Sequence, residues 1–252
     1  MRRALASLVA ALAICTLANP GPATSAPHVP VIVIDPGHSR SIHAIDRQTG
    51  LRVDDYENEP EMRDVFSVAR LVTARLRSLG YRVVMTKTSL NQRRNLAQRA
   101  RIANAAHADL AISIHDQAGR NGGIGFRTGN NIVYYQSVGD YRVTPRGHHV
   151  VFRNHVVARL SKRYAAEFAR ARRAVQHARM KVRGNVGYDL GSRGLAPGDI
   201  WIVQLLAHMP WIYNEAGGNS RGHVGLTAAD RRTYAASLVA GVEACIPPPR
   251  RA

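Results

Sequence analysis

Short apolar runs and longer helical patterns alternate along the chain. Residues 31–34 form an uninterrupted β-branched run that is stopped by a Pro-Gly pair, which predicts a fully buried strand. Apolar residues then recur at three- and four-residue steps over 65–79, and Gly80 predicts the end of this helix. Residues 81–85 predict a second strand. A strand, a helix and a strand over this length predict a right-handed parallel crossover.

The alternation continues to the C-terminus. A shorter helix is expected over 96–106, followed by an apolar strand at 110–114, and a long helix is expected over 150–179. The apolar side of the long helix is expected to carry Val151, His155, Ala158, Tyr164, Ala165 and Phe168. Its other side is expected to carry the arginines and lysines. The remaining expected elements are a glycine-rich loop at 119–130, apolar stretches at 132–136, 200–206 and 211–214, and a last helix from the capping box at Thr227 to the prolines at 247–249. This order predicts one α/β domain.

Residues 1–26 are expected to lie outside that domain. Arg2 and Arg3 precede an apolar run, and a stretch rich in Pro, Gly, Ser and Ala follows, as in a secretory signal peptide. The run is too short to span a bilayer comfortably, which favours a removed signal over a membrane anchor. We therefore expect an exported protein of the periplasm, cell wall or extracellular space, with its domain at 27–246 and a basic tail at 247–252. Cys245 would then be the only cysteine, so no intrachain disulfide is expected.

Basic residues strongly outnumber acidic ones. The chain holds 35 Lys and Arg against 17 Asp and Glu, and its net charge is +18, or +16 without Arg2 and Arg3. Such a field attracts polyanions, which for an exported protein would be anionic cell-wall polymers, outer-surface lipid or acidic peptide stems. Nucleic acid is a poorer candidate because few aromatic residues interleave the arginines. The most basic part lies between Tyr141 and Arg193, where a solvated helix face and a dedicated anion site both remain open.

Two of the predicted strands deliver a histidine at their carboxyl ends. His38 follows the first strand, and His115 follows the apolar run at 110–114. In open α/β sheets, ligands bind at this edge. A catalytic zinc needs three protein ligands and one open position, and two imidazoles with one carboxylate form a common set. Taken singly, each histidine could equally be a hydrogen-bonded cap, but two at equivalent strand ends favour a shared metal ion.

Carboxylates that could complete the site lie in the first crossover. Glu61 stands four residues before Val65 on the buried side of the predicted helix, so it should point toward the sheet. Glu57 and Glu59 fall in the preceding loop and are more simply solvated. Glu61 could alternatively be a charge favoured by the helix dipole. His43 is the other histidine of interest, because it shares a loop with His38.

Another carboxylate, Glu215, follows the apolar stretch at 211–214, so it lies at a third carboxyl-end position. It could act at the site or be a buried ion-pair partner.

Together these motifs resemble the zinc-dependent N-acetylmuramoyl-L-alanine amidases of the amidase_3 type. The likeness runs in order from about residue 30 to 246. It is carried by Ile34-Asp35-Pro36-Gly37-His38, Glu61 with Val68-Ala69, Leu96, Arg99, Ala103-Asn104, Ala108-Asp109-Leu110, Ser113-Ile114-His115, Pro210 and Glu215-Ala216-Gly217.

The resemblance implies a fold, a cofactor and an activity. The fold would be a single domain with a mixed, mostly parallel sheet flanked by helices, of the phosphorylase/hydrolase-like class. The activity would be hydrolysis of the amide bond between N-acetylmuramic acid and L-alanine in peptidoglycan, with one zinc ion. By position, His38, Glu61 and His115 match the family's zinc ligands, and Glu215 matches its catalytic glutamate, which would act as a general base.

The chain departs from the family pattern beside three of these four positions. Ser39 and Arg40 replace the usual glycine pair after the first histidine, Asp116 follows the second, and Asn214 precedes Glu215 where an apolar residue is common. None of these changes removes a ligand. Two other functions stay open. The chain could be another exported zinc peptidase or amidohydrolase on the same fold, or a non-catalytic basic protein that binds the cell wall.

Overall fold

A computed structural model describes residues 28–116, 131–184, 186–187, 198–217 and 225–249. Eight strands and their helices follow one another in chain order. They are β1 (Val31–Pro36), α1 (Glu59–Ser78), β2 (Arg82–Met85), α2 (Leu96–Ala105), β3 (Leu110–Asp116), β4 (Asn131–Tyr134), β5 (Tyr141–Val143), β6 (His149–Val151), α3 (His155–Gln176), β7 (Met180–Arg183), α5 (Ile202–Leu205), β8 (Trp211–Ala216) and α6 (Ala228–Cys245). The predicted signal peptide and the glycine-rich loop lie outside the described residues.

Six of the strands form one mixed sheet, in the order β2-β1-β3-β8-β4-β7. All neighbours in this sheet are parallel except β4 and β8, which are antiparallel. The predicted crossover from β1 through α1 to β2 is confirmed, as is the mixed, mostly parallel sheet flanked by helices. The three central strands β1, β3 and β8 are buried along their whole length. Their near-continuous apolar composition follows from this, because helices cover both faces.

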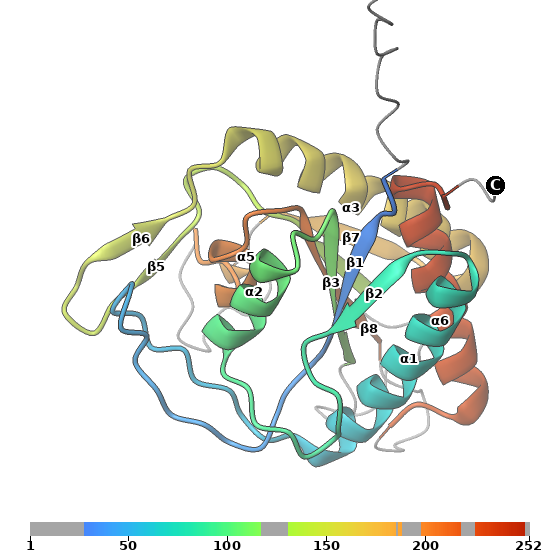
Figure 1. The fold of residues 1–252 in the computed structure, drawn as a ribbon, viewed down its shortest axis with the longest axis horizontal. Coiled ribbons are helices and arrows are strands. Elements are labelled where there is room, and N and C mark those ends of the chain that lie inside the picture. Colours follow the sequence, from blue (N-terminus) through green and yellow to red (C-terminus); the bar gives the residue numbers. More distant parts are fainter. Residues whose placement is uncertain (1–27, 117–130, 185, 188–197, 218–224, 250–252) are drawn as a thin grey trace, which may run out of the picture.

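Helices cover both faces of the sheet (Figure 1), and a hydrophobic layer lies on each face. On one face α1, α3 and α6 pack against residues such as Ile34, Ile112 and Ile212. On the other face the shorter α2 and α5 pack around Val33 and Trp211. Alternate residues of each strand serve the two layers, as the twofold period of a strand requires. Among the described helices, none combines the length and the apolar character that crossing a bilayer would demand.

Several helix boundaries agree with the sequence patterns. The capping box at Thr227 is confirmed, since its side chain accepts from the backbone N–H of Asp230 and the Asp230 side chain accepts from the backbone N–H of Thr227. Gly80 adopts φ +96° just after α1, which is the left-handed conformation that ends helices. Asn95 and Gln98 form a further capping box at α2.

The predicted long helix over 150–179 is wrong at its start. His149–Val151 pairs with Tyr141–Val143 as a hairpin, and α3 begins only after Asn154, whose side chain accepts from the backbone N–H of Val157. An Asn cap of this kind fixes a helix start more firmly than apolar periodicity does.

The sides of this helix were also only partly predicted. Ala165 and Phe168 are buried as expected, but His155 is exposed, and Arg172 is completely buried although arginines were expected on the outer side.

Candidate metal centre

The topology brings the two strand-end histidines together. β1 and β3 are parallel neighbours in which Pro36 pairs with Ile114, so the residues just beyond this point share the carboxyl edge of the sheet. The rings of His38 and His115 lie with centroids 5.0 Å apart, edge to face. β8 continues the edge on the other side of β3, and there Glu215 pairs in register with His115. Three chemically active side chains, distant in the sequence, therefore meet at one edge.

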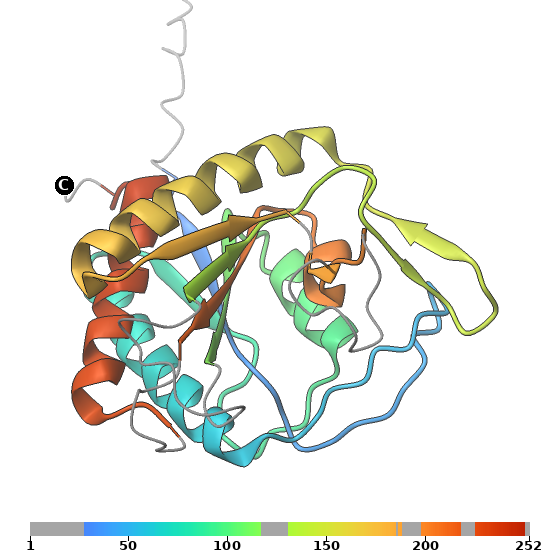
Figure 2. The same ribbon diagram turned by 180° about the vertical axis from the view of Figure 1, so that it is seen from behind.

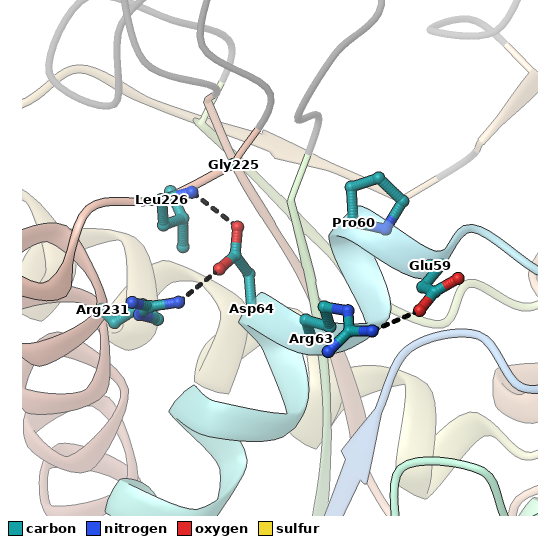
Figure 3. A pocket seen from close by; sticks show the side chains of 7 residues that line it. All are labelled: Glu59, Pro60, Arg63, Asp64, Gly225, Leu226 and Arg231. Carbon is teal, nitrogen blue, oxygen red and sulfur yellow. Dashed lines mark hydrogen bonds and ion pairs between the residues drawn. The ribbon is translucent and has the colours of Figure 1, made fainter.

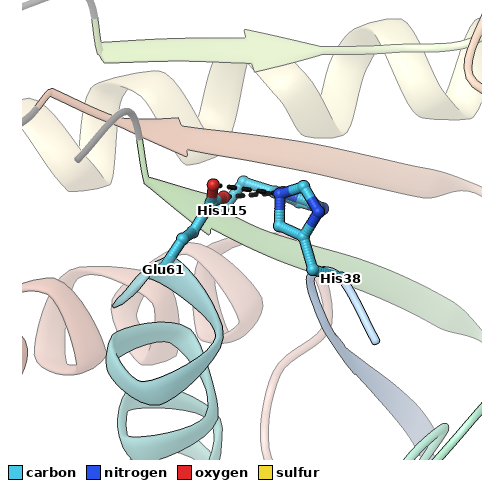
Figure 4. A group of neighbouring side chains, drawn as sticks. All are labelled: His38, Glu61 and His115. Carbon is cyan, nitrogen blue, oxygen red and sulfur yellow. Dashed lines mark hydrogen bonds and ion pairs between the residues drawn. The ribbon is translucent and has the colours of Figure 1, made fainter. Parts of the chain in front are cut away.

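Glu61 closes the group from the first turn of α1. Its Oε1 lies 2.9 Å from Nδ1 of His115, and its Oε2 lies 2.9 Å from Nε2 of His38 (Figure 4). One candidate donor atom from each residue lies within 4.8 Å of the others. Glu57 and Glu59 instead pair with Arg40 and Arg63 near the surface. Glu61 is thus the carboxylate of the three that reaches both histidines.

Further contacts fix the orientation of these groups. Nδ1 of His38 donates to the backbone carbonyl of Tyr56 at 2.9 Å, which leaves Nε2 to face Glu61. Glu61 accepts from the Asn58 side chain through Oε2 and from the backbone N–H of Asp116 through Oε1. The ring of His115 is stacked on Tyr213 with centroids 4.5 Å apart. Such supporting contacts are typical of histidines and carboxylates that bind metals.

The three groups share charge in a way that favours a cation. Burial disfavours the charged forms of all three, yet the two imidazoles hold the pKa of Glu61 below its ordinary value. Glu61 in turn raises the pKa of His38 against the effect of burial, whereas burial lowers the pKa of His115. Glu61 is therefore ionised, and its negative charge would stabilise a cation bound between it and the two histidines.

A buried charge network lies beneath the His38 loop. Arg99 donates to Asp35 at 2.8 Å and to Asp55 at 2.6 Å, and also to the carbonyls of Pro36 and His38. The Lys87 side chain donates to the carbonyls of Gly37 and His38. The backbone that carries His38 is thus held by two buried cations. The sequence motif included Arg99, but nothing in the pattern signalled what it or Lys87 contacts.

Glu215 lies beside this group without joining it. It is buried, and among the described residues its Oε2 has no hydrogen-bond partner. Burial and the nearby carboxylates of Glu61 and Asp116 raise its pKa well above the usual range, while Arg172 opposes this shift. A buried carboxyl oxygen with no partner is costly, and such groups concentrate at functional sites.

The buried Arg172 of α3 explains the unusual Asn214. The guanidinium donates to Oδ1 of Asn214 at 3.2 Å and to the backbone carbonyl of Glu215 at 2.9 Å. It also donates to Asn131 and Ile132 of β4. The polar residue before Glu215 is thus the partner of a buried cation on the helix side of the sheet. Arginine identity alone gave no signal of this, because its burial depends on partners distant in the sequence.

His43 lies outside the group. It is largely exposed, and its Nδ1 lies 3.4 Å from the Asp54 carboxylate. Ser39, in contrast, is buried beside His38, where its hydroxyl donates to the carbonyl of Arg94. The change from the family's glycine at this position therefore ties the His38 loop to the segment before α2.

A separate cavity of about 490 Å³ lies at the amino ends of α1 and α6 (Figure 3). Its lining residues are Glu59, Pro60, Arg63, Asp64, Gly225, Leu226 and Arg231. Asp64 accepts from the backbone N–H of Leu226 at 2.6 Å and from Arg231 at 2.7 Å. The charges of the wall thus satisfy one another, and none of the predicted site residues lines this cavity.

The donor set fits a zinc ion. Zinc in proteins is bound by imidazole and carboxylate at about 2.0–2.2 Å, so ligand atoms of a tetrahedral site lie about 3.3 Å apart. With one donor atom from each residue, the three donors lie within 4.8 Å of one another, which is somewhat wider than this spacing but close enough for all three side chains to reach one ion. With three protein donors, a fourth position would remain for water or substrate, as in catalytic sites.

Comparisons with known proteins agree with this fold. The structure resembles N-acetylmuramyl-L-alanine amidase Ami1 of Mycobacterium abscessus, with 18% identity, a TM-score of 0.58, and 86% of this chain and 98% of that one covered. Ami1 of Mycobacterium smegmatis gives 20% identity and a TM-score of 0.55, with 86% and 96% covered. N-acetylmuramoyl-L-alanine amidase AmiC2 of Nostoc punctiforme is 18% identical, with a TM-score of 0.54, and the match covers 86% of this chain and 97% of that one. These likenesses confirm the fold.

A comparison with curated proteins found no match. The family comparison did find one, since the model described as Amidase_3, N-acetylmuramoyl-L-alanine amidase, matches residues 32–243. This span runs from the second residue of β1 to a point in the last turn of α6 and includes every element between them. The chain belongs to the Amidase_3 family of N-acetylmuramoyl-L-alanine amidases.

Proposed function

We propose that this chain is a zinc-dependent N-acetylmuramoyl-L-alanine amidase, which hydrolyses the amide bond between N-acetylmuramic acid and L-alanine in peptidoglycan. His38, Glu61 and His115 would hold the ion, and Glu215 would be the catalytic base. The observation that carries the proposal is the convergence of three donors within 4.8 Å, next to a buried carboxylate that pairs in register with His115.

A zinc ion held by these three residues would supply a Lewis acid that activates water and polarises the amide carbonyl. The protein residues would move the protons. Glu215 would accept a proton from the attacking water as the oxygen bonds to the lactyl carbonyl carbon. It would then return that proton to the L-alanine nitrogen as the carbon–nitrogen bond breaks. The products are a free carboxyl group on muramic acid and a free amino group on the peptide, so one water molecule is consumed.

The surroundings of Glu215 suit this role. A general base works best when its pKa lies near the operating pH, and burial with two neighbouring carboxylates raises the pKa of Glu215. The positive charge of Arg172, on the α3 side of the sheet, limits this rise of the Glu215 pKa. Arg172 also bonds the backbone carbonyl of Glu215, so the same residue supports both the charge and the position of the carboxylate.

Substitution of Glu215 tests the proposal. Glu215→Gln preserves shape and should lower turnover by about 10²- to 10⁴-fold, the usual contribution of general acid–base catalysis. Zinc content should stay at one ion per chain. The assay is mass analysis of the products from purified peptidoglycan, with and without a chelator. Gln48→Glu, a conservative change in the first loop, is the matched control and should keep full activity.

The same product analysis separates the alternatives. An amidase releases intact stem peptides with a free L-alanine amino group, whereas a zinc peptidase on this fold would release shortened stems. A non-catalytic wall-binding protein would bind sacculi without dissolving them. Wild-type activity in Glu215→Gln would contradict the assigned base, and product lacking free L-alanine amino termini would contradict the assigned bond.

Export remains part of the proposal. We infer that residues 1–26 are a signal peptide, that 27–246 form the catalytic domain and that 247–252 form a basic tail. The apolar run behind Arg2 and Arg3 supports this division. N-terminal sequencing of the protein recovered from outside the cytoplasm should give a first residue between Thr24 and Pro27. An intact Met1 on the external protein would contradict it.

A further inference from the structure

A stripe of positive charge runs along the outer face of α3. Arg159, Lys162, Arg163, Arg170 and Arg173 are all exposed. At about 100° per residue these five positions fall within an arc of about 100°, and from first to last they span about 21 Å of helix. The buried residues of α3 occupy the opposite side and pack into the core. We call these five residues the α3 stripe.

The positive charges of the stripe lie close enough to repel one another, which a solvated helix face usually avoids by including acidic residues. Arg159 and Arg163 stand four residues apart, and Arg170 and Arg173 stand three apart. Like charges at these spacings repel one another and destabilise a helix. Glu167 is the single acidic residue of α3, and it is bonded to Arg170. The first helix shows the usual alternative, because there Arg63 pairs with Glu59 one turn away. The repulsion in α3 therefore suggests a ligand of opposite charge.

The positive surface extends beyond the helix. β7 lies alongside α3 at the edge of the sheet (Figure 2), and its Lys181 and Arg183 are exposed. Charged residues on an edge strand also discourage strand addition, so they alone would not indicate a ligand. The inference rests on the α3 stripe, and β7 widens the field around it.

We propose that the α3 stripe binds a linear polymer with repeating phosphate groups, such as an anionic polymer of a cell wall. Four of its five residues are arginines, whose planar guanidinium groups bind phosphate through two parallel hydrogen bonds. A narrow row of cations about 21 Å long matches an extended polyanion better than a single small ion.

Two other polyanionic surfaces fit less well. A helix that lies on a membrane inserts an apolar face between its basic residues, whereas the apolar side of α3 is buried in the core. Between Arg159 and Arg173 no large apolar side chain is exposed. Single-stranded nucleic acid is bound by stacking on exposed aromatic residues, whereas Tyr164, the aromatic residue beside the stripe, is half-buried against the core and already lies under the Arg163 guanidinium.

The stripe and the candidate metal centre lie apart. The stripe faces away from the sheet, because the opposite side of α3 packs on the sheet, where the buried Arg172 bonds to the backbone carbonyl of Glu215. Glu61 lies in the first turn of α1, at the bottom of Figure 1, whereas α3 crosses the top. A polymer held on α3 would therefore leave the carboxyl edge of the sheet accessible. Such binding would retain the protein at its site of action without occupying the site itself.

The test compares two triple variants of the full chain. Arg159→Gln, Arg163→Gln and Arg173→Gln remove three charges from the stripe. The matched control, Arg70→Gln, Arg75→Gln and Arg232→Gln, removes three exposed arginines from α1 and α6. Binding of long-chain inorganic polyphosphate is measured by fluorescence anisotropy between 50 and 300 mM salt, roughly the range over which such binding changes strongly.

The stripe variant should bind polyphosphate at least tenfold more weakly than the wild-type protein. The slope of log binding constant against log salt concentration should be shallower by about 2, because each phosphate contact of a flexible single strand contributes about 0.7 to this slope and three contacts are removed. The control variant should change much less. Equal weakening in both variants would show that the net charge of the whole protein, and not the α3 stripe, attracts polyphosphate, and it would overturn the proposal. Two further probes are vesicles of equal phosphatidylcholine and phosphatidylglycerol, and single-stranded DNA. Stronger stripe-dependent binding to either would also overturn it. None of these readouts requires amidase activity, so a failure here is distinguishable from a failure of the proposed function.

Discussion

The ring of His115 lies directly against the backbone of Gly37. A Cβ atom placed on Gly37 would lie 2.6 Å from Nε2 of His115 and closer still to Cε1. No other residue type fits there without moving the ring. The Pro-Gly pair that stops β1 therefore does more than end a strand, because it leaves room for the histidine of the neighbouring strand.

This contact predicts the behaviour of Gly37→Ala. The added methyl group should displace the His115 ring, lowering zinc affinity by about 10- to 100-fold, as loss of a supporting contact does. Overpacking should also cost about 1–3 kcal/mol of unfolding free energy. Isothermal titration with zinc measures the first effect and urea unfolding the second.

Gly241→Ala provides the matched control. Its Cβ would lie 2.7 Å from Cε1 of Phe168, in the core between α3 and α6. This variant should lose similar stability while each folded molecule keeps its zinc affinity. Equal loss of zinc affinity in both variants would contradict a specific role for Gly37.

The sequence predicted this edge of the sheet well, for a physical reason. Buried parallel strands read as continuous apolar runs, and their carboxyl ends must meet at one edge, so His38 and His115 could be placed together. Glu61 followed from helical spacing to Val65, and the structure places it between the two histidines. The assignment of these residues as ligands stays a prediction.

Other parts could not be read from local patterns. The second strand of the hairpin, β6, was taken for the start of a helix, because a three-residue strand leaves too few positions to distinguish the two periodicities. Arg172 was expected outside because its burial requires Asn131 and Asn214, which are far away in the sequence. Polar pairs across elements leave no periodic signal in either segment.

Removal of a bound metal should destabilise the protein. Zinc at 100 times its dissociation constant stabilises the folded state by about 2.7 kcal/mol, so a chelator should lower Tm and added zinc should restore it. His115→Ala and Glu61→Gln should abolish this zinc-dependent shift in differential scanning fluorimetry. His43→Ala, in the same loop as His38 but paired with Asp54, should keep it. A full shift in His115→Ala would disprove its role as a ligand.

The pair of Arg172 and Asn214 should be energetically coupled. Arg172→Met leaves buried amide and carbonyl oxygens without their donor, and we expect a loss of about 2–4 kcal/mol in urea unfolding. Asn214→Leu should also destabilise, but the double variant should lose less than the sum by about 1–2 kcal/mol. Arg173→Met, the exposed neighbour, should change stability by no more than about 0.5 kcal/mol. Strict additivity would show that the two side chains act independently.

Lys87 should make stability depend on alkaline pH. Its side chain is fully buried, and burial together with Arg99 lowers its pKa from 10.5 to about 8, although Asp35 and Asp55 oppose the shift. Between these two values the unfolded chain keeps a proton that the folded chain has lost. Unfolding therefore takes up a proton, and stability attributable to this group rises with pH by roughly 3 kcal/mol across the window. The difference in unfolding free energy between wild type and Lys87→Met, followed from pH 8 to 10.5 in urea, isolates this contribution from other titrating groups. The unfolding free energy of the wild-type protein should rise relative to that of the variant throughout that range. Parallel pH profiles would show that Lys87 keeps an ordinary pKa in the folded protein.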